Sequence, residues 1–348
     1  MTRRILAAAF ALPLAACGGV SPTAPQPPTS TSDITLVVFY DQNGNGLLDP
    51  SERVRLGGAR VTLAGQAGAS AAHTGEVTLH AVPAGTYTAA IDPSSLPPFY
   101  AQTGMPRVTV PSSQPAAVAV TLPIGSNQPN IYMAFGDSIT NGDGSTDNMG
   151  YRGVLQSDLD GLLGAGTVLD EGVEGTRTNE GAQRLPPTLA ADMPAYTLIH
   201  YGTNDWNKCA DQVPCFTIDS LRSMVHSCQA VKSLPVLATI IPANPAFPDQ
   251  VPPQRNIWVH QIDALIRPMA QQEGALLVDL EAAFLAHGNL PSLFSDHVHP
   301  NDQGYAIMAQ QFFKAITQPA GSTQGRSLAP STGIFFHPAR NSRPLARP

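Results

Sequence analysis

The sequence predicts an α/β protein built from two parts, a small all-β sandwich followed by a three-layer α/β/α domain with a parallel sheet. Residues 33–123 contain short runs rich in β-branched residues, separated by Gly, Pro and Asn, a pattern typical of antiparallel sandwiches. From residue 130 to residue 317, apolar runs of strand length alternate with stretches of helical periodicity. This alternation is typical of a parallel sheet covered on both faces, and the 348 residues are enough for both domains.

The composition of the chain excludes two broad classes of protein. Hydrophobic residues make up 43% of the chain and charged residues 13%, which excludes a wholly disordered protein. The net charge is −7 and no long basic run occurs, so we expect no nucleic-acid partner. Past the N-terminus, no apolar stretch reaches the length of about 18 residues that a membrane-spanning helix needs.

Residues 1–17, MTRRILAAAFALPLAAC, have the organisation of an export signal: two arginines, a short apolar core and then small residues. The segment resembles a bacterial lipoprotein signal, whose lipobox would be Leu14 to Cys17. That resemblance implies that Cys17 is lipidated and holds the protein at a membrane surface of the cell envelope without spanning it. An ordinary secretory signal stays open, and the protein would then be secreted. In both cases we expect a flexible tether over the Pro-rich residues 18–32.

Export sets the interpretation of the other three cysteines, because disulfides persist in oxidising compartments. Cys209 and Cys215 bracket a short loop that contains Pro214, and we expect these two cysteines to be bridged. Cys228 lies in a predicted helix and would then be a buried thiol, although pairings with Cys228 stay open. The spacing of the cysteines does not indicate a zinc site.

The β-sandwich module, residues 33–123, contains the loop DQNGNGLLDPSE at 41–52. Oxygen-bearing side chains recur there at the positions of an EF-hand calcium loop, and the candidate ligands are Asp41, Asn43, Asn45, Asp49 and Glu52. Strands rather than helices flank this loop. The segment resembles the calcium-binding B-type repeats of bacterial surface adhesins, which implies an immunoglobulin-like sandwich and a structural Ca²⁺. A metal-free Asn/Gly-rich hairpin is the alternative.

A linker is expected at residues 124–129, and the α/β/α domain at residues 130–317. Right-handed crossovers place helices on both faces of its sheet, and functional residues gather at the carboxyl ends of the strands. The predicted strands cover 130–135, 167–172, 196–202, 235–241 and 275–280, and the predicted helices cover 151–163, 218–232, 254–273 and 302–316. Residues 318–348 are rich in Pro, Ser, Gly and Arg and are expected to form a disordered tail.

Ser138 lies in AFGDSITNGDG, directly after the first predicted strand of the α/β/α domain. A serine hydroxyl is a poor nucleophile unless a base takes its proton. His299, in SDHVHP, is the candidate base, and Asp296 can fold back to accept a hydrogen bond from its imidazole. At two other strand ends, Gly172 offers a backbone N–H and Asn204 a side-chain amide, so both are candidate donors to an oxyanion.

Four short motifs occur in one order at predicted strand ends: GDSIT at 136–140, EGVEG at 171–175, GTND at 202–205 and DHVHP at 296–300. In this order they resemble the SGNH/GDSL hydrolases, a family of esterases and lipases with a flavodoxin-like fold. The resemblance covers the α/β/α domain and implies a serine hydrolase that needs no cofactor for catalysis. It places the nucleophile on Ser138, the base on His299 and the acid on Asp296. Its oxyanion hole falls on Ser138, Gly172 and Asn204, although Glu171 stands where many members carry a neutral residue.

Other polar residues beside these motifs receive structural interpretations. His297 is expected to face solvent or a neighbouring residue, since His299 has the D-x-x-H spacing. Asp137 and Asp205 are expected to accept hydrogen bonds that stabilise turns, and His200 is expected in the core or at its rim. Trp206 either lines the substrate site or packs under the Cys209–Cys215 loop.

The expected substrate is a carboxylic ester, of a small molecule or a polysaccharide. Short loops between the strands and the lack of a long apolar lid favour short-acyl esters, for example acetyl esters of carbohydrates or small alcohols. An O-acyltransferase or a lysophospholipase-like lipase would use the same residues. A surface-binding or adhesive protein, with its function in the β-module, is the alternative from another class, and the complete Ser/Gly/Asn/His set argues against it.

Overall fold

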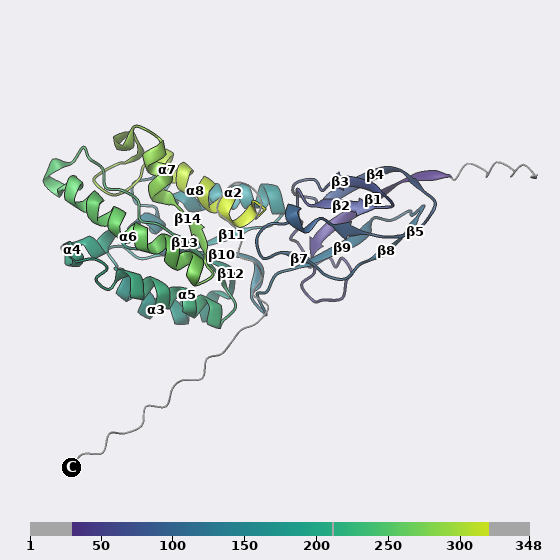
Figure 1. Cartoon of the computed structure of the whole chain (residues 1–348), viewed down its shortest axis with the longest axis horizontal. Helices are drawn as coiled ribbons and strands as arrows, with labels where there is room; N and C mark the ends of the chain where they lie inside the picture. The colour runs from purple at the N-terminus through teal and green to yellow at the C-terminus, as the bar shows by residue number, and fades with distance from the viewer. Residues whose placement is uncertain (1–29, 211, 320–348) are drawn as a thin grey trace, which may run out of the picture.

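The computed structural model describes residues 30–210 and 212–319, which form a β-rich module and an α/β domain arranged end to end (Figure 1). The predicted export signal with Cys17, the tether up to residue 29 and the tail from residue 320 lie outside the described residues. Among the described residues, no helix is both long and apolar enough to span a membrane.

The α/β domain is built on a five-stranded sheet whose strands are all parallel. The strand order is β11-β10-β12-β13-β14, so the first strand of the domain lies between the second and the third. The strands are β10 (Gln128–Gly136), β11 (Thr167–Gly172), β12 (Pro194–His200), β13 (Leu234–Ala238) and β14 (Leu276–Val278). Each of the five predicted strands is thus confirmed, and β14 is short because Asp279 caps the helix that follows it.

Helices cover both faces of this sheet, as the alternation of strands and helices predicts. The apolar residues of α2 (Tyr151–Leu163), α7 (Leu280–Ala286) and α8 (Asp302–Thr317) pack with Tyr132 and Ala134 of β10. Those of α3 (Thr178–Asp192), α5 (Thr217–Ala230) and α6 (Pro252–Gln272) pack on the other face with Met133 and Phe135. Figure 1 shows α2, α7 and α8 on one side of the sheet and α3 and α5 on the other. The remaining helices are short: α1 (Ser138–Asn141), α4 (Trp206–Cys209) and the 3-10 turns η1 (Pro93–Ser95), η2 (Thr203–Asp205), η3 (Pro248–Gln250) and η4 (Leu290–Leu293).

The helix α3 was not predicted from the sequence, although the four predicted helices are confirmed as α2, α5, α6 and α8. Pro186 and Pro187 lie inside α3, where each lacks the N–H that a regular helix uses. The helix nevertheless forms because Glu180 accepts the N–H of Arg177 at its start and because Leu185 and Leu189 are buried against the sheet. Tertiary packing therefore outweighs the local preference of the two prolines.

The N-terminal module consists of nine strands in three small sheets, ordered β4-β1-β9-β7, β3-β2-β6 and β5-β8. Most pairs are antiparallel, as expected, but β1 and β9 pair in parallel, which was not predicted from the sequence. These are the first and last strands of the module, and both lead toward the α/β domain (Figure 1). The strands are β1 (Thr31–Tyr40), β2 (Arg60–Leu63), β3 (Gln66–Ala69), β4 (Glu76–Pro83), β5 (Gly85–Thr88), β6 (Ala90–Ile91), β7 (Ala101–Gln102), β8 (Arg107–Val110) and β9 (Ala116–Thr121).

The loop 41–52, the candidate calcium site, is held together by its own hydrogen bonds. The buried carboxylate of Asp41 accepts the N–H groups of Gly44 and Gly46 at 2.7 and 2.8 Å, and that of Glu52 accepts the N–H of Gln42. The carboxylate of Asp49 accepts the side-chain amides of the two asparagines, Asn43 and Asn45. Among the described residues, no three or more His, Cys, Asp or Glu side chains converge as a metal site. The calcium ion therefore stays a prediction.

The module and the α/β domain share one buried apolar cluster. The N–H of Arg55 donates to the carbonyl of Leu163 at 2.7 Å, and the N–H of His73 donates to that of Leu162 at 2.8 Å, so the module holds the C-terminal end of α2. Between the domains, Ile124 is fully buried and β10 already begins at Gln128. In residues 124–129, predicted as a linker, Ile124, Asn127 and Pro129 are buried, whereas Gly125, Ser126 and Gln128 are exposed.

Candidate active site

The site is built on the turn that follows β10, the central strand. A Cβ at Gly136 would overlap the carbonyl oxygen of His200 and the hydroxyl of Thr140, so only glycine allows the chain to turn this closely against β12. Asp137 then caps α1, since its Oδ1 accepts the N–H of Ile139 at 3.0 Å. Ser138 is the first residue of α1 and is 8% exposed. The turn therefore presents one serine at the carboxyl edge of the sheet.

The structure brings Ser138, His299 and Asp296 together in one chain of contacts. Ser138 Oγ lies 2.9 Å from His299 Nε2, and His299 Nδ1 lies 2.7 Å from Asp296 Oδ2. An ionised carboxylate only accepts hydrogen bonds, so Nδ1 carries the proton. The lone pair of Nε2 is then free to accept the hydroxyl hydrogen of Ser138.

The loop 295–300 fixes Asp296 and His299 relative to each other. Asp296 Oδ1 accepts the N–H groups of Val298 and His299 at 2.8 and 2.7 Å. Burial raises the pKa of Asp296, but the hydrogen bonds from the imidazole and from these two N–H groups together outweigh burial and lower it. The side chain of His297 does not take the place of His299. Its ring packs edge-on against the ring of Phe247, and its Nδ1 lies 3.8 Å from Asp296 Oδ1.

Asn204 lies beside the serine turn, in the loop after β12. Its Nδ2 donates to the carbonyl of Thr176 at 3.0 Å and to Asp137 Oδ2 at 3.3 Å. The contact with Asp137 is long for a hydrogen bond between nitrogen and oxygen. One N–H of the Asn204 amide is therefore held firmly, and the other is available to a stronger acceptor nearby.

Gly172 does not face the serine in the way that its expected role requires. Its N–H donates to Asp170 Oδ1 at 3.0 Å, and a Cβ on it would overlap the backbone nitrogen of Asn141. Gly172 therefore packs behind the serine turn, with its N–H already engaged, and the expected donor role is not supported by this geometry. Sequence position after a strand could not show the direction of this N–H.

Gly175, in the same EGVEG motif, has the free N–H that Gly172 lacks. It is exposed, adopts a left-handed backbone with φ +69°, and its N–H has no acceptor among the described residues. The next residue, Thr176, accepts the Asn204 amide through its carbonyl. The N–H of Ser138 is likewise without an acceptor in the described part of the chain. The second glycine of the motif was the signal that sequence reasoning passed over.

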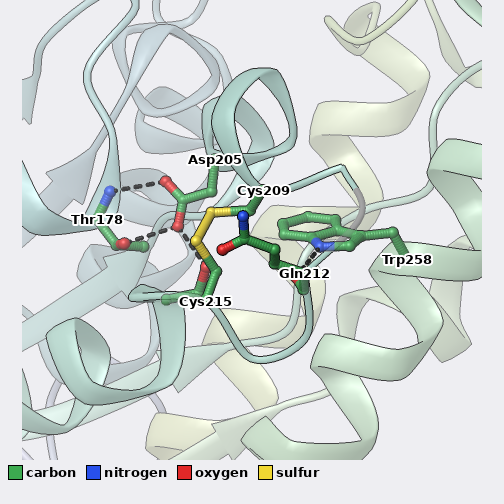
Figure 2. Close-up of a disulfide and its surroundings, with 7 residues drawn as sticks. Thr178, Asp205, Cys209, Gln212, Cys215 and Trp258 are labelled. Carbon is green, nitrogen blue, oxygen red and sulfur yellow. Dashed lines mark hydrogen bonds between the residues drawn. A yellow bond between two sulfur atoms is a disulfide. The ribbon is translucent and has the colours of Figure 1, made fainter.

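Asp205 anchors the loop of Asn204 to the helices behind it. Its fully buried carboxylate accepts the N–H and the hydroxyl of Thr178 and the hydroxyl of Thr217 at 3.0, 2.6 and 2.6 Å. Figure 2 shows Asp205 beside the disulfide between Cys209 and Cys215. Cys228 is a buried free thiol. Trp206 packs edge-on against Trp258 in the apolar cluster that includes this disulfide, which is one of the two positions expected for it.

Glu171, the departure in the second motif, pairs with a cation. Arg184 Nη1 lies 2.8 Å from its carboxylate, and Arg184 Nη2 donates to its carbonyl at 2.6 Å. The guanidinium also lies over the ring of Phe135, with its carbon 4.1 Å from the ring centroid. This arginine therefore ties the carboxyl ends of β10 and β11 together.

Two further titratable groups lie close to the serine turn and are fully buried. Burial raises the pKa of Asp137 to about 7, although the N–H of Ile139 and the nearby His299 act against that shift. Burial lowers the pKa of His200 to about 4, and neither ring nitrogen of His200 has a hydrogen-bond partner among the described residues. His200 is therefore a neutral residue near neutral pH and lies in the core, one of the two places expected for it.

A hydroxyl, an imidazole and a carboxylate in one hydrogen-bonded line, at the carboxyl edge of a parallel α/β sheet, define the class of serine hydrolases. The family model described as GDSL-like lipase/acylhydrolase matches residues 134–307. The chain belongs to this family, whose members are ester-hydrolysing enzymes that need no cofactor for catalysis.

Several solved structures are similar to part of this chain. An acetylxylan esterase from Geobacillus stearothermophilus is 23% identical, with a TM-score of 0.44, over 56% of this chain and 96% of that chain. A GDSL-like lipase from Bacteroides thetaiotaomicron is 19% identical, with a TM-score of 0.43, over 53% and 87%. A lipase/acylhydrolase from Enterococcus faecalis is 18% identical, with a TM-score of 0.44, over 54% and 94%. No curated protein matches the chain.

Proposed function

We propose that the protein is a serine esterase that hydrolyses short-acyl carboxylic esters through an acyl-enzyme on Ser138. The observation that carries this proposal is the line of contacts from Ser138 Oγ to His299 Nε2 at 2.9 Å and from His299 Nδ1 to Asp296 at 2.7 Å. Membership of the GDSL-like family supports the ester as the bond that is cleaved.

In the first half of the proposed reaction, Ser138 Oγ attacks the carbonyl carbon of the ester while His299 Nε2 takes the hydroxyl proton. Asp296 stabilises the imidazolium that forms, since its carboxylate holds the Nδ1 proton. The imidazolium then protonates the leaving alcohol. In the second half, the same histidine takes a proton from water, which attacks the acyl-enzyme and releases the acid and the free serine.

The negative oxygen of the tetrahedral intermediate needs hydrogen-bond donors on one side of the carbonyl. We assign these donors to the N–H of Ser138, the N–H of Gly175 and the side-chain amide of Asn204. Both N–H groups lack an acceptor in the described chain, and the Asn204 amide can exchange its 3.3 Å contact with Asp137 for the oxyanion. Gly172, whose N–H is engaged by Asp170, holds the turn behind these donors.

The location and substrate of the enzyme complete the proposal. The export signal at residues 1–17 supports an exported lipoprotein, lipidated at Cys17 and held at the surface of a membrane. Among the described residues, the connections that follow β12 and β13, 201–216 and 239–251, contain only the short helices η2, α4 and η3 and no long apolar lid, which supports an acetyl or similarly short acyl group on a carbohydrate or small alcohol. The N-terminal module, with its loop 41–52, serves in this proposal as a rigid spacer of the adhesin-repeat type.

The experiment that tests this proposal is a panel of esters that varies acyl length and alcohol, with the wild type and Ser138→Ala compared on each. We expect the highest kcat/KM on acetyl esters and the loss of nearly all turnover in Ser138→Ala. Equal rates for the two proteins would refute the nucleophile, and a preference for long-chain esters would refute the substrate class. Competing alcohols added to the same assay report any acyl transfer by the appearance of a new ester.

A further inference from the structure

The start of α6 contacts two separate segments of the active site, although none of its residues belongs to the four motifs. Arg255 is 6% exposed, and its Nη2 donates to the carbonyl of Thr203 at 2.8 Å. Thr203 directly precedes Asn204, the proposed oxyanion donor. A hydrogen bond from a buried cation to a carbonyl is stronger than one between neutral groups, so Arg255 holds the loop of Asn204 firmly.

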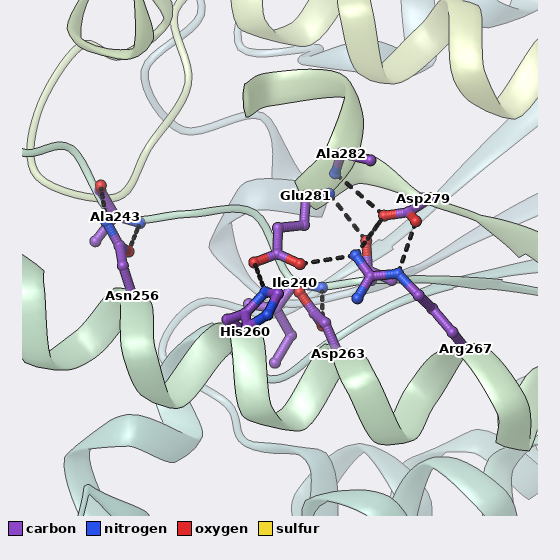
Figure 3. Close-up of polar contacts among 10 residues, drawn as sticks. Ile240, Ala243, Asn256, His260, Asp263, Arg267, Asp279, Glu281 and Ala282 are labelled. Carbon is purple, nitrogen blue, oxygen red and sulfur yellow. Dashed lines mark hydrogen bonds and ion pairs between the residues drawn. The ribbon is translucent and has the colours of Figure 1, made fainter. Parts of the chain in front are cut away.

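The next residue of α6, Asn256, holds a second loop in a two-point contact. Its Oδ1 accepts the N–H of Ala243 at 2.6 Å, and its Nδ2 donates to the carbonyl of the same residue at 3.0 Å. Figure 3 shows this pair of bonds, which joins α6 to the chain after β13. Both polar backbone groups of Ala243, a residue that is 3% exposed, are thereby satisfied by one side chain.

The next residue, Asn244, links this segment to the loop that carries Asp296 and His299. Asn244 is 3% exposed; its Nδ2 donates to the carbonyl of Asp296 at 2.9 Å, and its N–H donates to the carbonyl of His297 at 2.9 Å. The loop 295–300, which carries His299, is therefore joined to α6 through Asn244 and Ala243 by four hydrogen bonds.

We propose that the start of α6 positions both halves of the active site. Arg255 is a positioning residue for the oxyanion donor Asn204. Asn256, acting through Asn244, positions Asp296 and His299. This inference rests on the proposed function, and it adds residues that touch neither the substrate nor the reacting atoms.

The charges near Arg255 fit this role. Burial lowers the pKa of Arg255 to about 10, and the nearby carboxylates of Asp137 and Asp296 act against that shift. The guanidinium thus stays charged at neutral pH, under the influence of two acidic side chains of the site. A misplacement of reacting groups by about 1 Å costs on the order of a hundredfold in rate, so these contacts are expected to affect turnover more than substrate affinity.

The test uses the full-length protein and two isosteric substitutions. Asn244→Asp keeps the shape of the side chain but faces the carbonyl of Asp296 with an oxygen, and Asn256→Asp does the same to the carbonyl of Ala243. Arg255→Met removes the bond to Thr203. Gln254→Ala, an exposed position on the same turn, is the matched control. Turnover of p-nitrophenyl acetate is measured for each, per folded protein from circular dichroism, beside the wild type and Ser138→Ala.

We expect Asn244→Asp and Asn256→Asp to lower kcat by roughly ten- to a hundredfold, with KM changed by less than about threefold, and Gln254→Ala to match the wild type. We expect the same loss of kcat for Arg255→Met. This variant still tests the proposal if an aspartate variant does not fold. The proposal is overturned if the folded variants keep wild-type kcat while Ser138→Ala is inactive, and this result leaves the proposed function intact. If Ser138→Ala is as active as the wild type, the proposed function fails and this inference fails with it.

Discussion

Replacing Asp296 by asparagine tests the contact between acid and base. In Asp296→Asn, Oδ1 can still accept the N–H groups of Val298 and His299, now bonded at 2.8 and 2.7 Å, so the loop keeps its shape. The amide Nδ2 then faces His299 Nδ1, where the carboxylate lies at 2.7 Å. Because an amide N–H cannot accept the imidazole proton, that proton moves to Nε2, which then donates to Ser138 instead of accepting its hydrogen.

The size of the loss follows from how well the pair is shielded from water. In the serine proteases from which the triad is known, this substitution lowers turnover about 10⁴-fold. Here the Asp296 side chain is 41% exposed and that of His299 20% exposed, so water can partly replace the carboxylate. We expect kcat to fall by roughly 10²- to 10³-fold, equal to about 3–4 kcal/mol of activation free energy.

The assay for this variant is the turnover of p-nitrophenyl acetate at saturating substrate. Asp158→Asn, an exposed acid on α2, makes the same change of charge and should keep wild-type turnover. A kcat for Asp296→Asn within about threefold of the wild type would show that the His299 imidazole needs no carboxylate, against this prediction.

Three further predictions concern stability. Burial lowers the pKa of His200 to about 4, so below about pH 6.5 the folded protein binds fewer protons than the unfolded chain and loses stability as the pH falls. Between pH 7 and pH 4.5, we expect the free energy of unfolding of His200→Leu to fall by about 2 kcal/mol less than that of the wild type. Urea unfolding measures this difference, and equal losses would contradict the prediction. Tyr100, 8% exposed at the junction, should cost about 3 kcal/mol when replaced by alanine, in one thermal transition for the whole protein rather than two; two separate transitions in the wild type would contradict the shared core. If the loop 41–52 binds calcium, calcium at about 100 times its dissociation constant should stabilise the protein by about 2.7 kcal/mol. Identical melting temperatures in calcium and in a chelator would refute the predicted calcium site.

The strands of the α/β domain were predictable because each is a short, mainly apolar run, and the central strands β10, β12 and β13 are almost entirely buried. The helix α3 was not predictable, because Pro186 and Pro187 disfavour a helix locally and the helix forms only through packing on the sheet. The parallel pairing of β1 and β9 joins the two ends of the module, and a pairing over such a distance leaves no mark in local periodicity.

The candidate site divides in the same way. Ser138, Asp296, His299 and Asn204 could be found from the sequence, because each lies in a short motif at the end of a strand or before a helix. Gly172 was expected and Gly175 was missed, since the donor depends on where a backbone N–H points. The contacts of α6 with Thr203 and Ala243 also join residues from separate segments of the chain, and no sequence motif predicts them.

The proposed function depends on Ser138 as the nucleophile. The decisive measurement is to treat the protein with a fluorophosphonate, which forms a stable covalent bond with an activated serine, and to locate the adduct by peptide mass spectrometry. We predict one adduct, on the peptide that contains Ser138, with loss of ester hydrolysis in proportion to labelling and no adduct in Ser138→Ala. An adduct on another residue, or full hydrolysis after complete labelling of Ser138, would show that Ser138 is not the nucleophile.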